Sequence, residues 1–289
     1  MEAGDGESEE DRELILANTM DGMMEQWRSI IDSSLVEVLK RDDLQRSGTL
    51  HNACEYVLSG EGKRLRALLT CSVCRDLAKD ERSVAKALVP ALSIEILHAA
   101  SLVHDDLPIL DDDDMRRGKP SCHVAFDEPT ALLVGNTLQG IAFQVVSTSD
   151  VLSSDMQARL LRTLSHSWTS LCIGQHLDVC GAMLSAVERR EMIKHKTGAL
   201  FGAAVTCGAI CAGISEHALS LYYDWGVRIG EVFQALDDIA DGDLPKKELP
   251  RVQVEVEALC NQEASTLDSR LLSGNTKKLV SSLDSKCFN

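Results

Sequence analysis

Apolar residues recur at three- and four-residue spacing along most of the chain, which is the periodicity of amphipathic helices. The pattern is clearest over residues 12–39, and a polar break follows at 41–49. Alternating segments rich in Val, Thr and aromatic residues, which would indicate strands, are scarce. We therefore expect an all-α fold. Further helices are predicted over 51–58, 65–78, 83–89, 91–104, 130–146, 154–177, 186–211, 217–240 and 252–272.

The helical pattern continues without an internal repeat or a low-complexity linker, so we expect a single domain over 13–273. An acidic disordered tail, 1–12, precedes it, and a tail without clear periodicity, 274–289, follows it. Pro90 is expected to open the helix over 91–104, because proline is tolerated in a first turn. Pro108 resists any continuation of that helix.

Composition excludes several function classes. Among 289 residues, 45 are acidic and 29 basic, so the net charge of −16 repels nucleic acid and anionic membrane surfaces. The uncharged stretches 131–149 and 197–215 are long enough to resemble membrane spans, but their polar and small residues fit buried bundle helices better. Ten cysteines without a closely spaced framework indicate reduced thiols. We expect a soluble, cytoplasmic protein without a stable membrane anchor.

The first cluster of chemistry lies in HDDLPILDDDDMRRGKP, residues 104–120. Asp105 and Asp106 end an apolar helix, where carboxylates are costly unless they are paired or bound to a metal ion. A bend over 107–110 can bring Asp111 back toward Asp105. The carboxylates of 112–114 fit a solvated loop. This first acidic motif therefore offers Asp105, Asp106 and Asp111 as metal ligands.

A second acidic motif lies in VFQALDDIAD, residues 232–241. On a helix, Gln234, Asp237 and Asp241 share one face, and Asp238 lies beside them. Carboxylates one turn apart repel unless they are solvated or bridged by a cation, and oxygen ligands suit Mg²⁺. An exposed helix end explains this motif on its own. The presence of the first acidic motif favours metal binding.

Basic residues accompany both acidic motifs. Lys63 and Arg66 in GKRLR share a helix face, and Lys196 and Thr197 lie in HKTGALF. His98 lies two turns before Asp105. The other polar candidates are Arg116, Arg117, Lys119, Gln175 and Asp178. Two acidic motifs with separate basic groups are typical of a site that binds two diphosphates. Metal ions bridge carboxylates to one diphosphate, and Lys and Arg hold the second.

Taken in order, GKRLR, ILHAASLVHDDLPILDDDDMRRGKP, GQHLD, HKTGALF and FQALDD resemble the trans-isoprenyl diphosphate synthases, which include the farnesyl and geranylgeranyl diphosphate synthases. The resemblance covers residues 60–241. It implies an all-helical bundle with a central cavity, usually a homodimer. It also implies an Mg²⁺-dependent prenyltransferase, with Mn²⁺ as a possible substitute, that condenses isopentenyl diphosphate with allylic diphosphates.

The resemblance also assigns roles residue by residue. The implied metal ligands, which bind the allylic diphosphate through Mg²⁺, are Asp105, Asp106, Asp111, Asp237, Asp238 and Asp241. The implied isopentenyl diphosphate ligands are Lys63, Arg66, His98 and Arg117. Arg116 and Lys196 would help to hold the allylic diphosphate. Thr197 and Gln234 would contact the allylic substrate or the cation formed from it.

Product length is implied by the position five residues before the first aspartate. In the family, an aromatic residue there tends to stop the chain at fifteen carbons. Here the position is Ala100, followed by Ser101. The absence of a bulky side chain predicts geranylgeranyl diphosphate. Farnesyl diphosphate is the alternative, because another helix can supply the floor.

The chain departs from the family pattern after Asp241, where GDLPKKELPRVQVEVEAL replaces a segment resembling GK..G.D...K.TYP. Asn136 also stands where the family often has aspartate. A weakly active regulatory subunit of a heteromeric synthase is therefore an alternative. Some such subunits meet their partners through short cysteine motifs similar to CSVC (71–74) and CGAIC (207–211), although buried thiols are the expected explanation.

A class I terpene cyclase is a third hypothesis, since such enzymes also ionise a prenyl diphosphate with an aspartate-rich motif. Their other metal site is normally of the type N-D-x-x-S-x-x-x-E, which VFQALDDIAD does not match. GKRLR would have no role in an enzyme with a single substrate.

Overall fold

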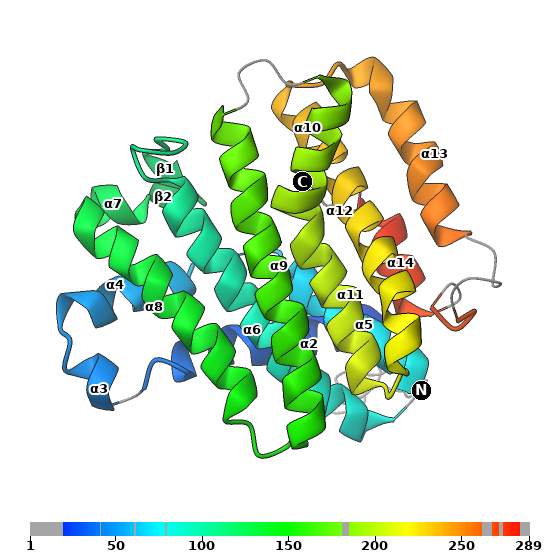
Figure 1. The fold of residues 1–289 in the computed structure, drawn as a ribbon, viewed down its shortest axis with the longest axis horizontal. Coiled ribbons are helices and arrows are strands. Elements are labelled where there is room, and N and C mark those ends of the chain that lie inside the picture. The colour runs from blue at the N-terminus through cyan, green and yellow to red at the C-terminus, as the bar shows by residue number, and fades with distance from the viewer. Residues whose placement is uncertain are drawn as a thin grey trace, which may run out of the picture.

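The computed structural model describes residues 20–40, 42–60, 62–78, 80–180, 185–261, 268–271 and 274–283. It confirms the all-α prediction (Figure 1). The α-helices are α2 (Met20–Glu37), α3 (Asp42–Gln45), α4 (Thr49–Leu58), α5 (Leu65–Ala78), α6 (Glu81–Asp105), α7 (Cys122–Ala125), α8 (Glu128–Ser147), α9 (Ser154–Cys180), α10 (Ala186–Ile193), α11 (Ala199–Cys211), α12 (Leu219–Asp241), α13 (Leu249–Cys260) and α14 (Asn275–Ser281). Residues 12–19, the acidic tail 1–12 and residues 284–289 lie outside the described residues.

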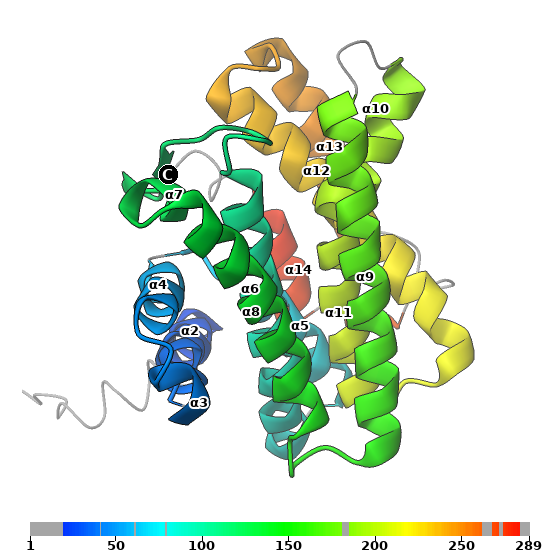
Figure 2. The same ribbon diagram turned by 60° about the vertical axis from the view of Figure 1, so that its left-hand side comes forward.

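Helix α6 lies in the centre of the bundle and packs against α5, α8 and α11 (Figures 1 and 2). The predicted break at Pro90 is wrong, because α6 runs through it. Burial explains this: Ala91, Ile94 and Leu97 are fully buried, and their packing offsets the backbone hydrogen bond that proline cannot donate. By length and composition, residues Arg82–Asp105 would also pass as a membrane span, but 72% of the most apolar stretch is buried inside the bundle.

The segment predicted as one helix over 186–211 contains a π-helical turn, η1 (Lys194–Gly198), between α10 and α11. Such turns are rare and frequently mark functional sites. Here the turn includes Lys196 and Thr197. Every residue of α11 is buried, whereas none of α10 is. The π turn thus joins a core helix to a surface helix.

Several short elements were not predicted from the sequence, among them α3, α7, a hairpin and α14. The hairpin β1 (Met115–Arg116) and β2 (Lys119–Pro120) has Arg117 and Gly118 in its loop, both with positive φ, as a type I′ turn requires. Helix α14 begins where both carboxylate oxygens of Asp76 accept backbone N–H bonds, from Asn275 at 2.9 Å and Thr276 at 2.7 Å. The remaining short elements are the 3₁₀ turns η2 (Glu216–Ala218) and η3 (Lys246–Glu248).

The cysteine pairs 71/74 and 207/211 lie on α5 and α11, two helices that pack against each other, and all four thiols are buried. Burial raises the pKa of each, for example that of Cys74 to about 12. These are the buried helix thiols that we expected. Their side chains face the core of the bundle.

Candidate active site

The first acidic motif is folded back on itself. The backbone N–H of Asp111 donates to the carbonyl of Asp105 at 2.8 Å, and that of Asp112 donates to Leu107 at 3.2 Å. Asp112 adopts φ 54°, a left-handed conformation that Asp tolerates better than most residues. The predicted bend over 107–110 is therefore confirmed, and it returns Asp111 to the end of α6.

The carboxylates of this motif differ in how their charge is balanced. Asp105 is 9% exposed and Asp106 2% exposed. Burial raises the pKa of Asp105 to about 7; Lys196 opposes the shift, and Asp111 and Asp106 add to it. Arg116 Nε donates to Asp106 at 2.9 Å, yet burial still raises the pKa of Asp106. Asp105 has no ion pair with a described cation, so its charge is the least compensated.

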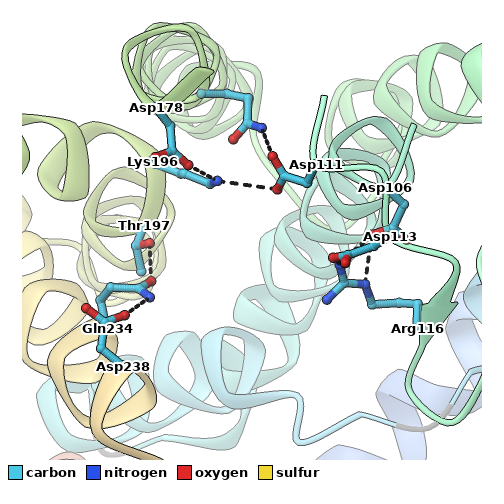
Figure 3. Close-up of polar contacts among 10 residues, drawn as sticks. Asp106, Asp111, Asp113, Arg116, Asp178, Lys196, Thr197, Gln234 and Asp238 are labelled. Atoms are coloured by element: carbon cyan, nitrogen blue, oxygen red, sulfur yellow. Dashed lines mark hydrogen bonds and ion pairs between the residues drawn. The ribbon is translucent and has the colours of Figure 1, made fainter. Parts of the chain in front are cut away.

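Helix α9 and the π turn approach the same motif from the opposite side (Figure 3). Gln175 Nε2 donates to Asp111 Oδ1 at 3.1 Å, and Lys196 Nζ lies 3.6 Å from Asp111 Oδ2. Lys196 also forms an ion pair with Asp178. The carbonyl oxygen of Gln175 is buried without a hydrogen-bond partner. Such an oxygen beside buried carboxylates fits a hydrated hard cation such as Mg²⁺.

Gly174 allows α9 to approach the π turn closely. A Cβ at Gly174 would lie 2.1 Å from the backbone nitrogen of Lys196, so any other residue would push η1 away. Ser170, one turn earlier on α9, forms a 2.7 Å hydrogen bond with His195. The backbone carrying Lys196 and Thr197 is thus held from α9.

We predict that Gly174→Ala destabilises the fold by about 3 kcal/mol, because overpacking a rigid backbone contact has this scale. It should also lower turnover by displacing Lys196. Gly140→Ala is the matched control: it lies in α8 with no atom within 4 Å of an added Cβ, so it should stabilise by about 0.5 kcal/mol. Denaturant unfolding measures both. Equal effects at the two glycines would contradict the close packing.

The second acidic motif lies at the end of α12, across from the first. Thr197 Oγ1 donates to Gln234 Oε1 at 2.7 Å, and Gln234 Nε2 donates to Asp238 Oδ1 at 2.8 Å (Figure 3). Burial, together with Asp241 and Asp238, raises the pKa of Asp237. Both oxygens of Asp238 are engaged, because Arg189 lies 3.6 Å from Oδ2.

A cavity of about 760 Å³ lies beside the second motif and carries the basic residues. Its lining residues are Arg28, Asp32, Gly62, Lys63, Arg64, Leu65, Arg66, Glu95, His98, Arg117, Phe233 and Asp237. The four residues predicted to bind isopentenyl diphosphate, namely Lys63, Arg66, His98 and Arg117, are all among them. Residues from three separate motifs therefore meet in one space.

Arg66 has the most specific surroundings in this basic cavity. Its Nη1 donates to His98 Nε2 at 3.2 Å, and its guanidinium lies 4.5 Å from the ring centre of Phe201 and 6.0 Å from that of Phe233. Burial lowers the pKa of Arg66 to about 10, and Glu95 opposes the shift, so the side chain stays charged. Burial and neighbouring arginines lower the pKa of His98, so His98 acts as a neutral group.

Two of the arginines reach the cavity through left-handed backbone, with φ 48° at Arg64 and 52° at Arg117. A Cβ at Gly62 would meet Arg64 at 3.0 Å and Arg117 at 3.2 Å, so the glycine makes room for both guanidinium groups. The Arg64 side chain is anchored by Asp32 Oδ1 at 2.6 Å and by the Gly60 carbonyl at 2.7 Å.

Sequence reasoning missed Arg64, Glu95, Phe201 and Phe233. Glu95 could have been predicted from the sequence, because it is a carboxylate inside an apolar helix and lies three residues before His98. It is 3% exposed and lies 3.8 Å from Arg64, so it balances the cations of the basic cavity. The two phenylalanines carried no local signal, since their contacts with Arg66 span more than a hundred residues.

Within the described residues, no three carboxylate, histidine or cysteine side chains converge into a complete metal cage. Mg²⁺ is usually held by one or two carboxylates, waters and substrate phosphates rather than by protein alone. The six aspartates predicted as ligands lie in two groups, on α6 with the loop after it and on α12.

The two residues predicted to set product length lie differently. Ser101 lines a cavity of about 260 Å³ next to Asp105, together with Trp168, Leu171 and Cys172 of α9. Ala100 is fully buried and is absent from the lining of that cavity. Ser101 is therefore the residue of this pair that faces the space beneath the first acidic motif.

Comparisons with known proteins agree with this geometry. A family model described as Polyprenyl synthetase matches residues 47–252. The chain is 37% identical to a farnesyl diphosphate synthase of Haemophilus influenzae over 66% of each chain. It is also 37% identical to geranylgeranyl pyrophosphate synthase 11, chloroplastic, of Arabidopsis thaliana, over 71% of this chain and 59% of that one. The matches thus span about three fifths to two thirds of these relatives' lengths.

Longer matches support the same assignment. A geranylgeranyl diphosphate synthase of Cyanophora paradoxa is 32% identical over 83% of each chain. Among solved structures, an FPP/GFPP synthase of Zymomonas mobilis aligns with a TM-score of 0.79 at 29% identity, covering 93% of this chain and 99% of that one. With its helical bundle, two acidic motifs and basic cavity, the chain belongs to the polyprenyl synthetase family.

Proposed function

We propose that the protein is a prenyltransferase that condenses isopentenyl diphosphate with an allylic diphosphate. The observation that carries this proposal is the pairing of two unlike anion sites: two acidic motifs suited to a metal-bridged diphosphate, and a basic cavity that shares Asp237 with the second of them. An enzyme that joins two diphosphates needs both. A class I cyclase, which has one substrate, has no use for the basic cavity.

The proposed metal ligands are Asp105, Asp106, Asp111, Asp237 and Asp241. Asp238, the sixth aspartate predicted, accepts from Gln234 and pairs with Arg189. Asp111 also has two partners, Gln175 and Lys196, but Lys196 is itself proposed to hold the diphosphate. The proposed ligands would hold Mg²⁺, or Mn²⁺ in its place, which would supply positive charge against the allylic diphosphate as it departs. Lys196 lies where it can hold the same diphosphate. Arg116, which is tied to Asp106 and Asp113, keeps the loop after α6 in place and offers a second cation.

The remaining chemistry uses groups on the chain. When the allylic C–O bond breaks, the carbon cation is stabilised by oxygen dipoles, and the Thr197 hydroxyl and Gln234 carbonyl form such a pair. Lys63, Arg66 and Arg117 hold isopentenyl diphosphate, and neutral His98 adds a hydrogen bond. The double bond of isopentenyl diphosphate then attacks the cation, one C–C bond forms, and a proton is lost.

Geranylgeranyl diphosphate is the product that we propose. The cavity next to Asp105 is lined on its α6 side by small Ser101. Farnesyl diphosphate is the second candidate, because the larger rings of Trp168 on α9 and His104 on α6 also line this cavity.

We predict that Ser101→Phe shifts the main product from twenty carbons to fifteen, because an aromatic side chain fills the cavity next to Asp105. The measurement is chromatography of the products formed from isopentenyl diphosphate and the five-carbon primer dimethylallyl diphosphate with Mg²⁺. Ser101→Ala is the matched control and should leave the length unchanged. A twenty-carbon product from Ser101→Phe would contradict this placement of the product chain.

We also propose a homodimer that forms through α8 and α9. Three large apolar side chains are each about half exposed: Leu132 and Leu133 on α8, and Ile173 on α9. Exposed apolar side chains that form a patch often mark an interface between proteins. Light scattering on the isolated chain should give twice 31.5 kDa. A cytoplasmic location stays a prediction; one of the relatives named above is described as chloroplastic.

The proposal is tested by incubating the isolated chain with Mg²⁺, labelled isopentenyl diphosphate and each allylic primer. Labelled product of greater chain length supports a synthase. Product formed from the allylic substrate without isopentenyl diphosphate would indicate a cyclase. An isolated chain that makes no product would indicate a regulatory subunit.

A further inference from the structure

Two ion pairs join helix α10 to α12, the helix that carries the second acidic motif. None of the α10 residues is buried. The pairs are Arg189 Nη2 with Asp238 Oδ2 at 3.6 Å, and Arg190 Nε with Glu231 Oε1 at 2.9 Å. Asp238 and Glu231 are two turns apart on one face of α12. One of the two arginines therefore ends on the acidic motif, and the other ends outside it.

The Arg189 contact continues into the allylic site. Arg189 holds Oδ2 of Asp238, Oδ1 of Asp238 accepts from Gln234 Nε2, and Gln234 Oε1 accepts from Thr197 (Figure 3). An ionised carboxylate can only accept hydrogen bonds, so it fixes the amide nitrogen of Gln234 on its own side. The amide oxygen then points toward Thr197, the side on which the proposed mechanism puts the cation.

This orientation matters because the two ends of an amide have opposite polarity. The carbonyl end stabilises a positive charge, whereas the NH₂ end repels it. If the Gln234 amide were flipped by about 180°, it would fill the same space, but its NH₂ group would face the cation and repel it. Whatever holds Asp238 in place thus also selects the end of Gln234 that faces the reacting carbon.

We propose that Arg189 is a positioning residue for the allylic site, acting through Asp238 to keep the Gln234 carbonyl turned toward the developing cation. The inference rests on the proposed prenyl transfer. It also assigns Asp238 to the amide and leaves Asp237 and Asp241 to the metal ions. Because the Arg189 side chain is 55% exposed, its ion pair contributes little to folding, so a variant should fold normally.

The test compares Arg189→Gln with Arg190→Gln, the matched control on the same helix, and with Arg189→Lys. The contact uses one nitrogen, so lysine should restore it. Each variant is titrated calorimetrically, with Mg²⁺ and inorganic diphosphate present, with a prenyl ammonium ion and with its uncharged carbon isostere. We expect Arg189→Gln to weaken binding of the ammonium about tenfold and to leave the isostere unchanged. Arg190→Gln should bind both as the wild type does.

Turnover gives a second readout. Arg189→Gln should lower kcat about tenfold without raising the KM for isopentenyl diphosphate, and Arg189→Lys should recover most of the loss. Equal loss for the charged and uncharged analogues, equal loss in the two glutamine variants, or a wild type that does not distinguish the analogues would overturn the inference. A wild type that makes no product would instead refute the proposed function, and the binding comparison would still decide the role of Arg189.

Discussion

Replacing Asp105 with asparagine should lower prenyl transfer about 1,000-fold and at the same time make the metal-free protein more stable. The loss of activity follows because an amide cannot supply the negative charge that binds Mg²⁺, and removal of a preorganised electrostatic contact has this scale. The gain in stability follows because Asp105 is 9% exposed and has no ion pair with a described cation.

The stability change depends on pH, and its sign follows from the raised pKa. Burial raises the pKa of Asp105 to about 7 from an ordinary value of 3.8. Between these values the folded protein binds more protons than the unfolded chain, so stability falls as pH rises and the loss is complete above pH 7. Ionisation of Asp105 in the folded protein lowers the free energy of unfolding by about 4 kcal/mol. Asp105→Asn should therefore gain most at pH 8 and little at pH 4.

Thermal or denaturant unfolding in EDTA at pH 5 and pH 8 measures this difference. Asp112→Asn is the matched control, because Asp112 is exposed and asparagine tolerates its left-handed backbone. It should change neither activity nor the pH dependence by a large factor. If Asp105→Asn were less stable than the wild type, the buried Asp105 carboxylate would not be destabilising, and this explanation would be wrong.

Replacing Arg66 with glutamine should raise the KM for isopentenyl diphosphate about 100-fold and leave the KM for the allylic substrate nearly unchanged. Arg66 lies between His98 and the Phe201 ring, so its charge is held in place and partly desolvated. Removing one partner of such a charge-assisted contact costs about 2–5 kcal/mol. Arg66→Lys should recover part of the loss, since lysine keeps the charge but cannot form the planar fork.

Initial rates with one substrate varied at a time measure the two KM values. Arg28→Gln is the matched control, because Arg28 lines the same cavity but forms its ion pair with Glu25 of its own helix. It should change either KM only slightly. If Arg66→Gln raised both KM values equally, the two diphosphates would not have separate sites.

Parts of the site that depend on local geometry could be predicted from the sequence. The return of Asp111 to Asp105 follows from an apolar helix that meets a proline. The face shared by Gln234, Asp237 and Asp241 follows from helical periodicity. Both features involve residues close together in the chain, where spacing determines position.

Parts that depend on packing between distant segments could not be predicted. Nothing near Arg66 indicates that Phe201 lies over it, and nothing near Asp76 indicates that it caps a helix about 200 residues later. The break predicted at Pro90 failed for the same reason, since burial of α6 in the bundle outweighed the local effect of proline. The choice of Ser101 over Ala100 as the cavity-lining residue likewise depends on how α9 packs against α6.

The central claim is that one chain holds two diphosphates at separate sites, one through metal ions and the other through basic side chains. Calorimetric titration with isopentenyl diphosphate and with a non-ionisable allylic diphosphate analogue, each with and without Mg²⁺, tests it most directly. We predict that isopentenyl diphosphate binds without Mg²⁺, that the allylic analogue requires it, and that both bind together with one of each per chain. Competition between the two ligands for a single site would contradict the account.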